Sequence, residues 1–327
     1  MTVLCVVEAD EGGLADSSRR VLAFARGLAG SSGENLAAAL FGPAAGVPAG
    51  ELGECGVPDG YAIDSAELTG YAPLAWARAL SGLAASLPAT AVVAAGTDRG
   101  SELMAHLAAI AGQPMAANCV SAARDEAGGC RLVRHRWAGS LLEDATLDAP
   151  VAVLTVAVDA VAPTPAGAPA VTAVHAVEPE LEPGDLRVRA TESATRGTGI
   201  SLATARVVVG GGRGVGGPEG FAPLEELAGL LGAAVGVSRV VTSQGWRPHT
   251  QQVGQTGTRI TPELYLACGI SGAIQHMAGC LGAKHIVAIN TDAGAPIISR
   301  AEYAVIGDLS EVIPALIAGI RQHNDKS

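Results

Sequence analysis

The sequence predicts an α/β protein of two domains, each built around a mostly parallel sheet, with a doubly wound, Rossmann-like second domain. The chain has 327 residues, enough for two domains of ordinary size. Hydrophobic residues make up 49% and charged residues 16%, which is typical of a globular chain. Short apolar runs alternate with segments of helical periodicity, and this rhythm indicates parallel βαβ units.

The N-terminal half begins with this alternation. The predicted strands are 3–7, 35–41 and 91–95, and the predicted helices are 17–28, 74–87 and 101–111, the last closed by Gly112. After residue 113 the pattern changes, because the next predicted strands, 131–137 and 151–158, have no helix between them. A connection rich in proline and alanine at 161–170 then leads to the predicted strands 171–177 and 186–190.

A second polar, glycine-bearing stretch, 192–199, precedes the most apolar strand of the C-terminal part. We therefore expect a domain boundary near residue 196, with an N-terminal domain of 1–195 and a C-terminal domain of 196–327.

Charge and hydropathy exclude two classes of partner. The net charge is −11 and no basic stripe is present, which disfavours nucleic-acid binding. No apolar run reaches the roughly 18–20 residues that span a bilayer, so we expect no membrane insertion. The first residues enter an apparent strand without a basic leader region, which predicts a cytoplasmic protein.

The cysteines show no metal-binding pattern. No pair has CxxC spacing, and no histidine lies at zinc-finger distance from any of them. We expect buried free thiols and no metal site. They are Cys5, Cys55, Cys119, Cys130, Cys268 and Cys280.

Three apolar runs of the C-terminal part end in polar or glycine-rich turns that a helical pattern follows. The runs are 206–209, 264–267 and 286–289. In open parallel sheets, ligands bind beyond the carboxyl ends of the strands. The three turns are therefore predicted to converge on one ligand.

The first of these turns matches the spacing GxGxxG at Gly212, Gly214 and Gly217. A dinucleotide site of the NAD type also needs an acidic residue about 20 residues later. The next strand end, predicted at 240–243, carries none, which disfavours that reading. Arg213 offers a fixed cation to a phosphate or an anionic ring, although a solvated loop arginine is equally consistent with the sequence.

The second turn combines glycines with Ser271, a predicted N-cap, and with His276 on the predicted second helical turn. A single helical histidine is often only structural. The polar loop 251–258 supplies hydrogen-bonding groups without fixed charge. Asn290 and Asp308 follow strands, where a turn-forming and an N-capping role are the simpler interpretations.

The order and wording of these segments resemble the electron-transfer flavoprotein alpha subunit family. VVVGGGRG at 207–214 is similar to the family's VVVSGGRG, and Ser238-Arg239 follows in the family's order. The strings at 252–257, 262–279 and 286–297 are nearly those of the family. The N-terminal half is similar more loosely, with Trp137-Ala138-Gly139-Ser140 where the family commonly has Tyr-Ala-Gly-Asn.

The resemblance implies that the C-terminal domain binds FAD, and it assigns the contacts position by position. It implies that Arg213, Ser238 and Arg239 line the FAD, with the Arg239 guanidinium over the isoalloxazine. It places Val253, Gly254, Gln255 and Thr256 beside the isoalloxazine. It places Ser271, Gly272, Ala273, Ile274, Gln275 and His276 at the flavin and ribityl chain, with His276 near the flavin O2. It assigns Asn290, Asp308 and Leu309 to the ribityl, phosphate and adenosine portions.

The family is a heterodimer of alpha and beta subunits, and the beta subunit carries AMP. Electrons come from flavoprotein dehydrogenases, such as the acyl-CoA dehydrogenases of fatty acid oxidation, and leave toward a quinone-linked oxidoreductase or another acceptor. The resemblance therefore implies an electron carrier and not an enzyme. Two alternatives stay open: an NAD-dependent dehydrogenase subunit, which would hold NAD, and a non-catalytic nucleotide-binding module, which would hold no redox-active cofactor.

Overall fold

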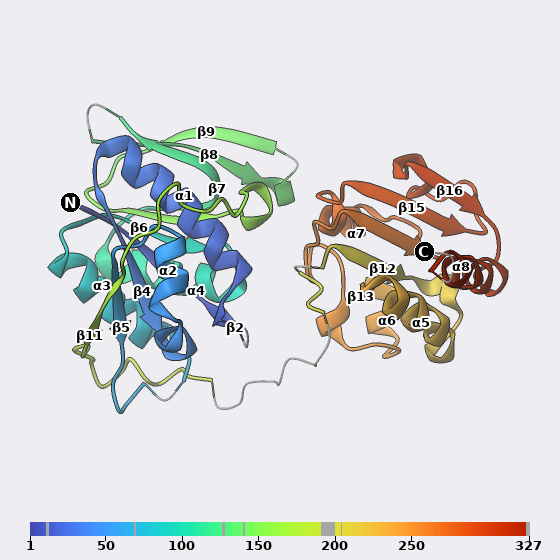
Figure 1. Ribbon diagram of the computed structural model, residues 1–327, viewed down its shortest axis with the longest axis horizontal. Helices are drawn as coiled ribbons and strands as arrows, with labels where there is room; N and C mark the ends of the chain where they lie inside the picture. The colour runs from blue at the N-terminus through green and yellow to red at the C-terminus, as the bar shows by residue number, and fades with distance from the viewer. Residues whose placement is uncertain are drawn as a thin grey trace. The chain divides into compact units, whose positions relative to one another are not determined.

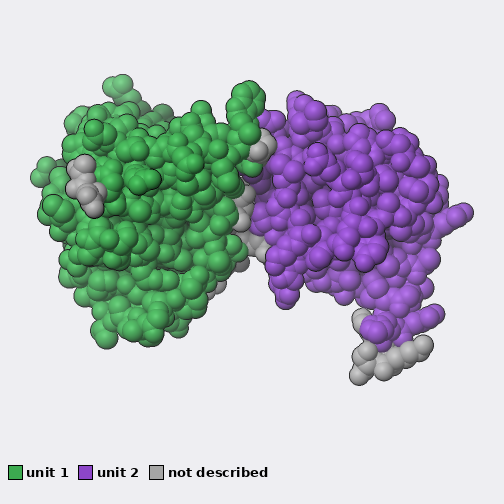
Figure 2. Space-filling view, turned by 90° about the horizontal axis from the view of Figure 1, so that it is seen from above, with its two compact units in different colours: residues 1–194 green, residues 195–327 purple. Residues whose placement is uncertain are grey.

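The computed structural model describes residues 1–10, 13–68, 70–125, 128–139, 141–190, 200–203 and 205–324. The chain divides into two compact units, Met1–Ala194 and Thr195–Ser327 (Figure 2). The predicted boundary near residue 196 falls within 191–199, outside the described residues. Both units are α/β and contain a mostly parallel sheet, so the predicted fold class is confirmed.

Unit 1 contains a sheet in the order β11-β5-β4-β1-β6-β10-β7-β8-β9 (Figure 1). All neighbours from β11 to β7 pair in parallel, and β8 and β9 extend the sheet as antiparallel strands. The strands are β1 (Thr2–Val7), β4 (Asn35–Phe41), β5 (Asp59–Ile63), β6 (Ala89–Ala95), β7 (Met115–Arg124), β8 (Cys130–Arg136), β9 (Leu141–Leu147), β10 (Ala152–Val156) and β11 (Ala173–Val177). The short strands β2 (Ala9–Asp10) and β3 (Gly13–Leu14) pair separately.

Helices cover both faces of this sheet. They are α1 (Asp16–Ser32), α2 (Ala49–Glu54), α3 (Pro73–Ser86) and α4 (Asp98–Ala111). Helix α1 packs with one set of alternating β1 side chains, and α3 and α4 pack with the other set. Every side chain of β1 is therefore buried, which explains its uninterrupted apolar sequence. Gly112 ends α4 in the left-handed region, as predicted.

Sequence patterns missed or misplaced some elements of unit 1. Strands β5, β7 and β9 were not predicted, because each includes residues of low β propensity: Asp and Gly in β5, four alanines and an Asn in β7, and Glu and Asp in β9. The predicted strand 186–190 is wrong, because this segment forms turns and bends. The carboxylate of Asp185 accepts a hydrogen bond from the Glu182 amide (2.8 Å), and this turn takes the place of strand pairing.

Unit 2 contains a wholly parallel sheet in the order β13-β12-β14-β15-β16. The strands are β12 (Val207–Gly211), β13 (Ala234–Val237), β14 (Leu264–Cys268), β15 (His285–Asn290) and β16 (Tyr303–Ile306). The helices are α5 (Ala222–Leu231), α6 (Arg239–Ser243), α7 (Ile274–Cys280) and α8 (Leu309–Asn324). Helices α5 and α8 share one core with the sheet, and α7 contributes to the core on the other face. The strand order reverses between β12 and β14, which is where such sheets bind ligands.

The strand end predicted at 240–243 is wrong. Strand β13 ends at Val237, and the residues from Arg239 to Ser243 form α6. The apolar pair Val240-Val241 is typical of a strand, but the structure uses Val241 as a helical core residue and leaves Val240 exposed. Ser238 and Arg239 are therefore the residues that follow β13, and neither is acidic.

All six cysteine side chains are buried, as predicted. Within the described ranges, no helix combines the length and the apolar character required to cross a membrane.

Two glycines let the turns after β12 and β14 touch through their backbones. The Gly214 amide donates to the Gly269 carbonyl at 3.0 Å. A Cβ added at Gly214 would lie 2.7 Å from the Cα of Gly269, which has φ of 63°. Gly212 and Gly214 of the GxGxxG match thus serve a close approach of two chain segments, since a Cβ on either would meet the backbone of Gly269.

We expect Gly214→Ala to lower the free energy of unfolding by about 2 kcal/mol, because backbone atoms must move to admit the methyl group. Gly229→Ala is the matched control, since that helical glycine has open space around it and alanine there gains up to about 1 kcal/mol. Urea unfolding followed by circular dichroism measures both. Equal effects of the two substitutions would contradict the close-contact argument.

Candidate functional site

Backbone hydrogen bonds join the carboxyl ends of all five strands of unit 2. They run from Ser238 N to Gly211 O (3.0 Å), Gly212 N to Cys268 O (2.9 Å), Gly269 N to Ile289 O (2.8 Å) and Gly307 N to Asn290 O (3.1 Å). The loop before β14 is joined to the same edge through the Val253 amide, which donates to the Val237 carbonyl at 2.9 Å. One edge of one sheet therefore carries every segment in which a site residue was predicted.

Two arginines are exposed at this edge. Arg213 follows β12 and Arg239 follows β13, and these two strands are neighbours in the sheet. Neither guanidinium forms an ion pair or a hydrogen bond with another residue in the described ranges. Guanidinium groups left available in this way suit a phosphate or an anionic ring.

Gln252, which was not predicted as a site residue, fixes the loop beside the arginines. Its side chain is 2% exposed. Its Oε1 accepts from the Thr242 hydroxyl of α6 (2.7 Å), and its Nε2 donates to the Thr256 hydroxyl (3.0 Å). Gln252 therefore ties α6 to the polar loop. The sequence places it at the start of that loop, but its partner in α6 is visible only in the structure.

Helix α7 begins later than predicted. Its N-cap residue is Ala273, and Ser271 makes no capping hydrogen bond, so the predicted N-cap is wrong. The cause is Gly272, which has φ of 80° and lies so close to Ile297 that a Cβ would be 2.7 Å from that side chain. This bend delays the helix, and His276 lies on its first turn rather than its second.

The α7 turn presents most of its side chains to solvent. Ala273, Ile274 and Gln275 are exposed, and Ile274 is 84% exposed. The Gln275 carbonyl accepts from the Gln255 amide (2.8 Å), which holds the polar loop against α7.

His276 is the buried member of this turn, with 6% of its side chain exposed. Its Nε2 lies 2.8 Å from the Tyr265 hydroxyl, and its Nδ1 forms no hydrogen bond within the described part of the chain. Burial lowers the pKa of His276 to about 4, although the nearby Val253 carbonyl opposes the shift. The imidazole is therefore neutral near pH 7, and one ring nitrogen is left for another partner.

Asn290 and Asp308 have the structural roles that the sequence allowed. The Asn290 amide donates to the Ile270 carbonyl (2.9 Å) and accepts from the Asp292 amide (3.0 Å), which fastens two turns together. The Asp308 carboxylate accepts from the Ser310 hydroxyl (2.7 Å) and, as the N-cap of α8, from the Ser310 amide (2.8 Å). These two hydrogen bonds lower the pKa of its carboxyl, the one from the hydroxyl more strongly. Leu309 follows it and packs close to Gly269.

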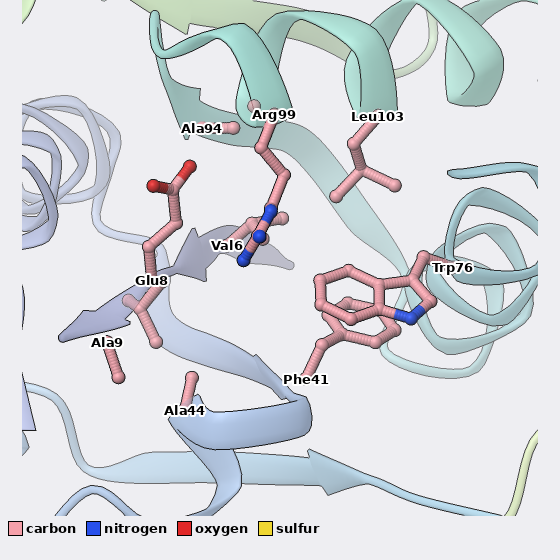
Figure 3. Close-up of a pocket in the computed structure, with 11 residues that line it drawn as sticks. Val6, Glu8, Ala9, Phe41, Ala44, Trp76, Ala94, Arg99 and Leu103 are labelled. Atoms are coloured by element: carbon pink, nitrogen blue, oxygen red, sulfur yellow. The ribbon is translucent and has the colours of Figure 1, made fainter. Parts of the chain in front are cut away.

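Unit 1 has a cavity at the carboxyl ends of its own strands (Figure 3). Trp76 stacks on Phe41 with ring centroids 4.6 Å apart, and the Arg99 guanidinium carbon lies 6.0 Å from the centroid of the Trp76 ring. Glu8 accepts a hydrogen bond from the Thr97 hydroxyl at 2.5 Å. These side chains leave a cavity of about 10 Å³, which holds roughly one water molecule. The crevice of unit 1 is therefore filled by its own residues.

The exposed groups at this edge of unit 2 suit a dinucleotide or a flavin. They are a glycine-lined turn, two available guanidinium groups and the buried His276 Nδ1, which has no hydrogen bond within the described part of the chain. Two family models then specify the class: an electron transfer flavoprotein domain matches residues 3–181, and an electron transfer flavoprotein FAD-binding domain matches 201–281.

Two curated relatives are similar to this chain over nearly its whole length, and a third is similar over a shorter part. The electron transfer flavoprotein subunit alpha of Thermoanaerobacterium thermosaccharolyticum is 34% identical over 319 residues, covering 96% of each chain. That of Mycobacterium tuberculosis is 38% identical over 320 residues, covering 98% of each chain. That of Paracoccus denitrificans is 57% identical over 115 residues, or 35% of this chain and 37% of that protein. The chain belongs to the electron transfer flavoprotein alpha subunit family, and its cofactor is FAD.

His276 gives a prediction for pH dependence. The unfolded chain binds a proton on this ring below about pH 6.5, and the folded chain does so only near its folded pKa of about 4. The free energy of unfolding therefore falls by up to about 3 kcal/mol as pH drops from 7 to 4 through this group alone. His276→Gln removes this part of the slope in urea unfolding at pH 7 and pH 4.5. The exposed His249→Gln keeps it, and equal slopes in both variants would contradict the assignment.

Proposed function

We propose that this chain is the FAD-carrying alpha subunit of a heterodimeric electron carrier, with FAD at the carboxyl edge of the unit 2 sheet. The observation that carries the proposal is the convergence of the predicted segments on one edge of a unit that matches the family's FAD-binding domain. The proposed FAD-contacting residues are those assigned by resemblance: Arg213, Ser238, Arg239, Val253, Gly254, Gln255, Thr256, Ser271, Gly272, Ala273, Ile274, Gln275, His276, Asn290, Asp308 and Leu309.

Each part of the edge has a distinct role in this proposal. Arg213 and Arg239 supply positive charge for the phosphates and for the ring. The loop of Val253 to Thr256 supplies amide and hydroxyl groups, held in place by Gln252. His276 supplies a neutral imidazole nitrogen. When bound, FAD supplies the electron-accepting ring, which gains negative charge on reduction.

The proposed partners follow the family. They are a beta subunit carrying AMP, flavoprotein dehydrogenases such as acyl-CoA dehydrogenases as donors, and a quinone oxidoreductase as acceptor. The exposed Leu141 and Leu142 of edge strand β9 support docking of a second chain on unit 1. The chain acts as a carrier and not as an enzyme, and the expected cytoplasmic location stays a prediction.

The absorbance spectrum of the heterodimer tests the proposed function. We expect the bands of an oxidised flavin and about one FAD per alpha–beta pair. NAD in place of flavin would favour the dehydrogenase alternative. The absence of any redox-active cofactor would favour a nucleotide-binding module.

We predict that the partnership is obligate. Produced without a beta subunit, the chain is expected to be poorly soluble or to lose its flavin, because unit 1 then exposes its docking surface. Light scattering combined with flavin absorbance measures both properties. A stable monomer saturated with FAD would refute this prediction.

The charge of Arg239 is predicted to raise the midpoint potential of the bound FAD. A cation near a ring that gains negative charge stabilises it by roughly 1–2 kcal/mol, after allowance for solvent and charge delocalisation. Since about 1.4 kcal/mol corresponds to about 59 mV for one electron, Arg239→Ala should lower the first potential by about 40–85 mV.

A dye-linked redox titration at matched FAD content measures the effect. Arg239→Lys is expected to recover part of the potential, because it keeps the charge but loses the planar group that stacks on a ring. A potential in Arg239→Ala within about 10 mV of the original protein would show that the guanidinium does not face the ring.

A further inference from the structure

Tyr265 and His276 form a buried polar pair beneath the exposed edge. Tyr265 lies on β14 with its side chain fully buried, and His276 lies on α7, the helix that follows this strand. The hydroxyl oxygen is 2.8 Å from Nε2, and the two rings are stacked with an interplanar angle of 29°. A buried polar group costs free energy unless it is hydrogen-bonded. The hydrogen bond between Tyr265 and His276 therefore lowers the cost of burying both groups in an otherwise apolar core.

The neighbouring strand leaves room for the hydroxyl. Gly210 of β12 pairs beside Ala267, and a Cβ added at Gly210 would collide with the hydroxyl and ring of Tyr265. The absence of a side chain at Gly210 therefore leaves the space that the hydroxyl occupies. Because the Tyr265 side chain is fully buried, the hydroxyl has no access to solvent.

The number of available acceptors decides which of the two groups donates the hydrogen bond. Within the described residues, His276 is the only hydrogen-bond partner of the Tyr265 hydroxyl. If Nε2 carried the proton and donated it, the hydroxyl hydrogen would be buried without an acceptor, at a cost of about 1–3 kcal/mol. When Tyr265 donates, the hydroxyl is satisfied and Nε2 is the acceptor. Burial also raises the pKa of Tyr265 well above its ordinary value, so the hydroxyl keeps its proton.

We propose that Tyr265 is a positioning residue that holds His276 in the Nδ1–H tautomer, so that His276 offers FAD a fixed, uncharged N–H donor. This proposal rests on the proposed function. It adds Tyr265 as the residue that determines which nitrogen of His276 carries the hydrogen. Nδ1 is buried and has no hydrogen bond within the described part of the chain, which leaves it to an added partner.

The tautomer is measured by nitrogen-15 NMR of the heterodimer labelled at histidine, with FAD bound and after FAD is removed. The His276 signals are identified by their loss in His276→Ala. We expect the original protein to carry hydrogen on Nδ1 in both forms, and Tyr265→Phe to show the Nε2–H form as well. Hydrogen on Nε2 in the original protein would overturn the proposal.

The effect on FAD is measured on the same variants. Tyr265→Phe is expected to bind FAD about five-fold more weakly, as for the loss of one hydrogen bond, and to lower its midpoint potential. Tyr303→Phe is the control, because it removes an exposed hydroxyl in the same unit. In a His276→Ala background, Tyr265→Phe should change the potential no further, since its effect passes through the imidazole. An equal shift in both backgrounds would mean that Tyr265 acts only on packing, and this would overturn the proposal.

The proposed function and the positioning role of Tyr265 can be refuted separately. A heterodimer that binds no FAD refutes the proposed function, and the NMR measurement on the cofactor-free protein still decides the tautomer. A heterodimer that binds FAD and shows hydrogen on Nε2 retains the proposed function and refutes the positioning role. Gly210→Ala gives a second route, because it displaces the hydroxyl without removing it and should reproduce the NMR change of Tyr265→Phe.

Discussion

The contact between Gly214 and Gly269 is the constraint on which the candidate site depends. It brings the turns after β12 and β14 together at the point where the strand order reverses, with an amide-to-carbonyl distance of 3.0 Å. No side chain fits between the two turns, so backbone groups line the middle of the edge and side chains gather at its sides. Arg213, Arg239 and the polar loop can then face one ligand.

The edge has an exposed layer over a buried polar layer. The exposed layer carries the two arginines, and the buried layer contains Gln252, Tyr265 and His276. Each buried group is hydrogen-bonded to another element: Gln252 joins α6 to the polar loop, and Tyr265 joins β14 to α7. Buried networks of this kind limit side-chain rotation, so the groups above them keep one geometry before a ligand arrives.

The sequence predicted the fold class and the order of strands and turns in unit 2, because both follow from local periodicity and from turn residues. It failed where tertiary contacts override local preference. The pair Val240-Val241 was interpreted as a strand but belongs to a helix, and Ser271 lost its N-cap role to a bend at Gly272. The roles of Gln252 and Tyr265 could not be predicted, since each depends on a partner ten or more residues away in the chain.

Hydrogen exchange of the heterodimer with and without FAD tests the central claim most directly, namely that FAD lies at the carboxyl edge of the unit 2 sheet. We expect FAD to slow exchange at the amides of 212–216, 238–240, 253–257 and 270–276, and to leave the amides around the small cavity of unit 1 unchanged. Protection centred on the strand ends of unit 1, or protection spread evenly over both units, would contradict it.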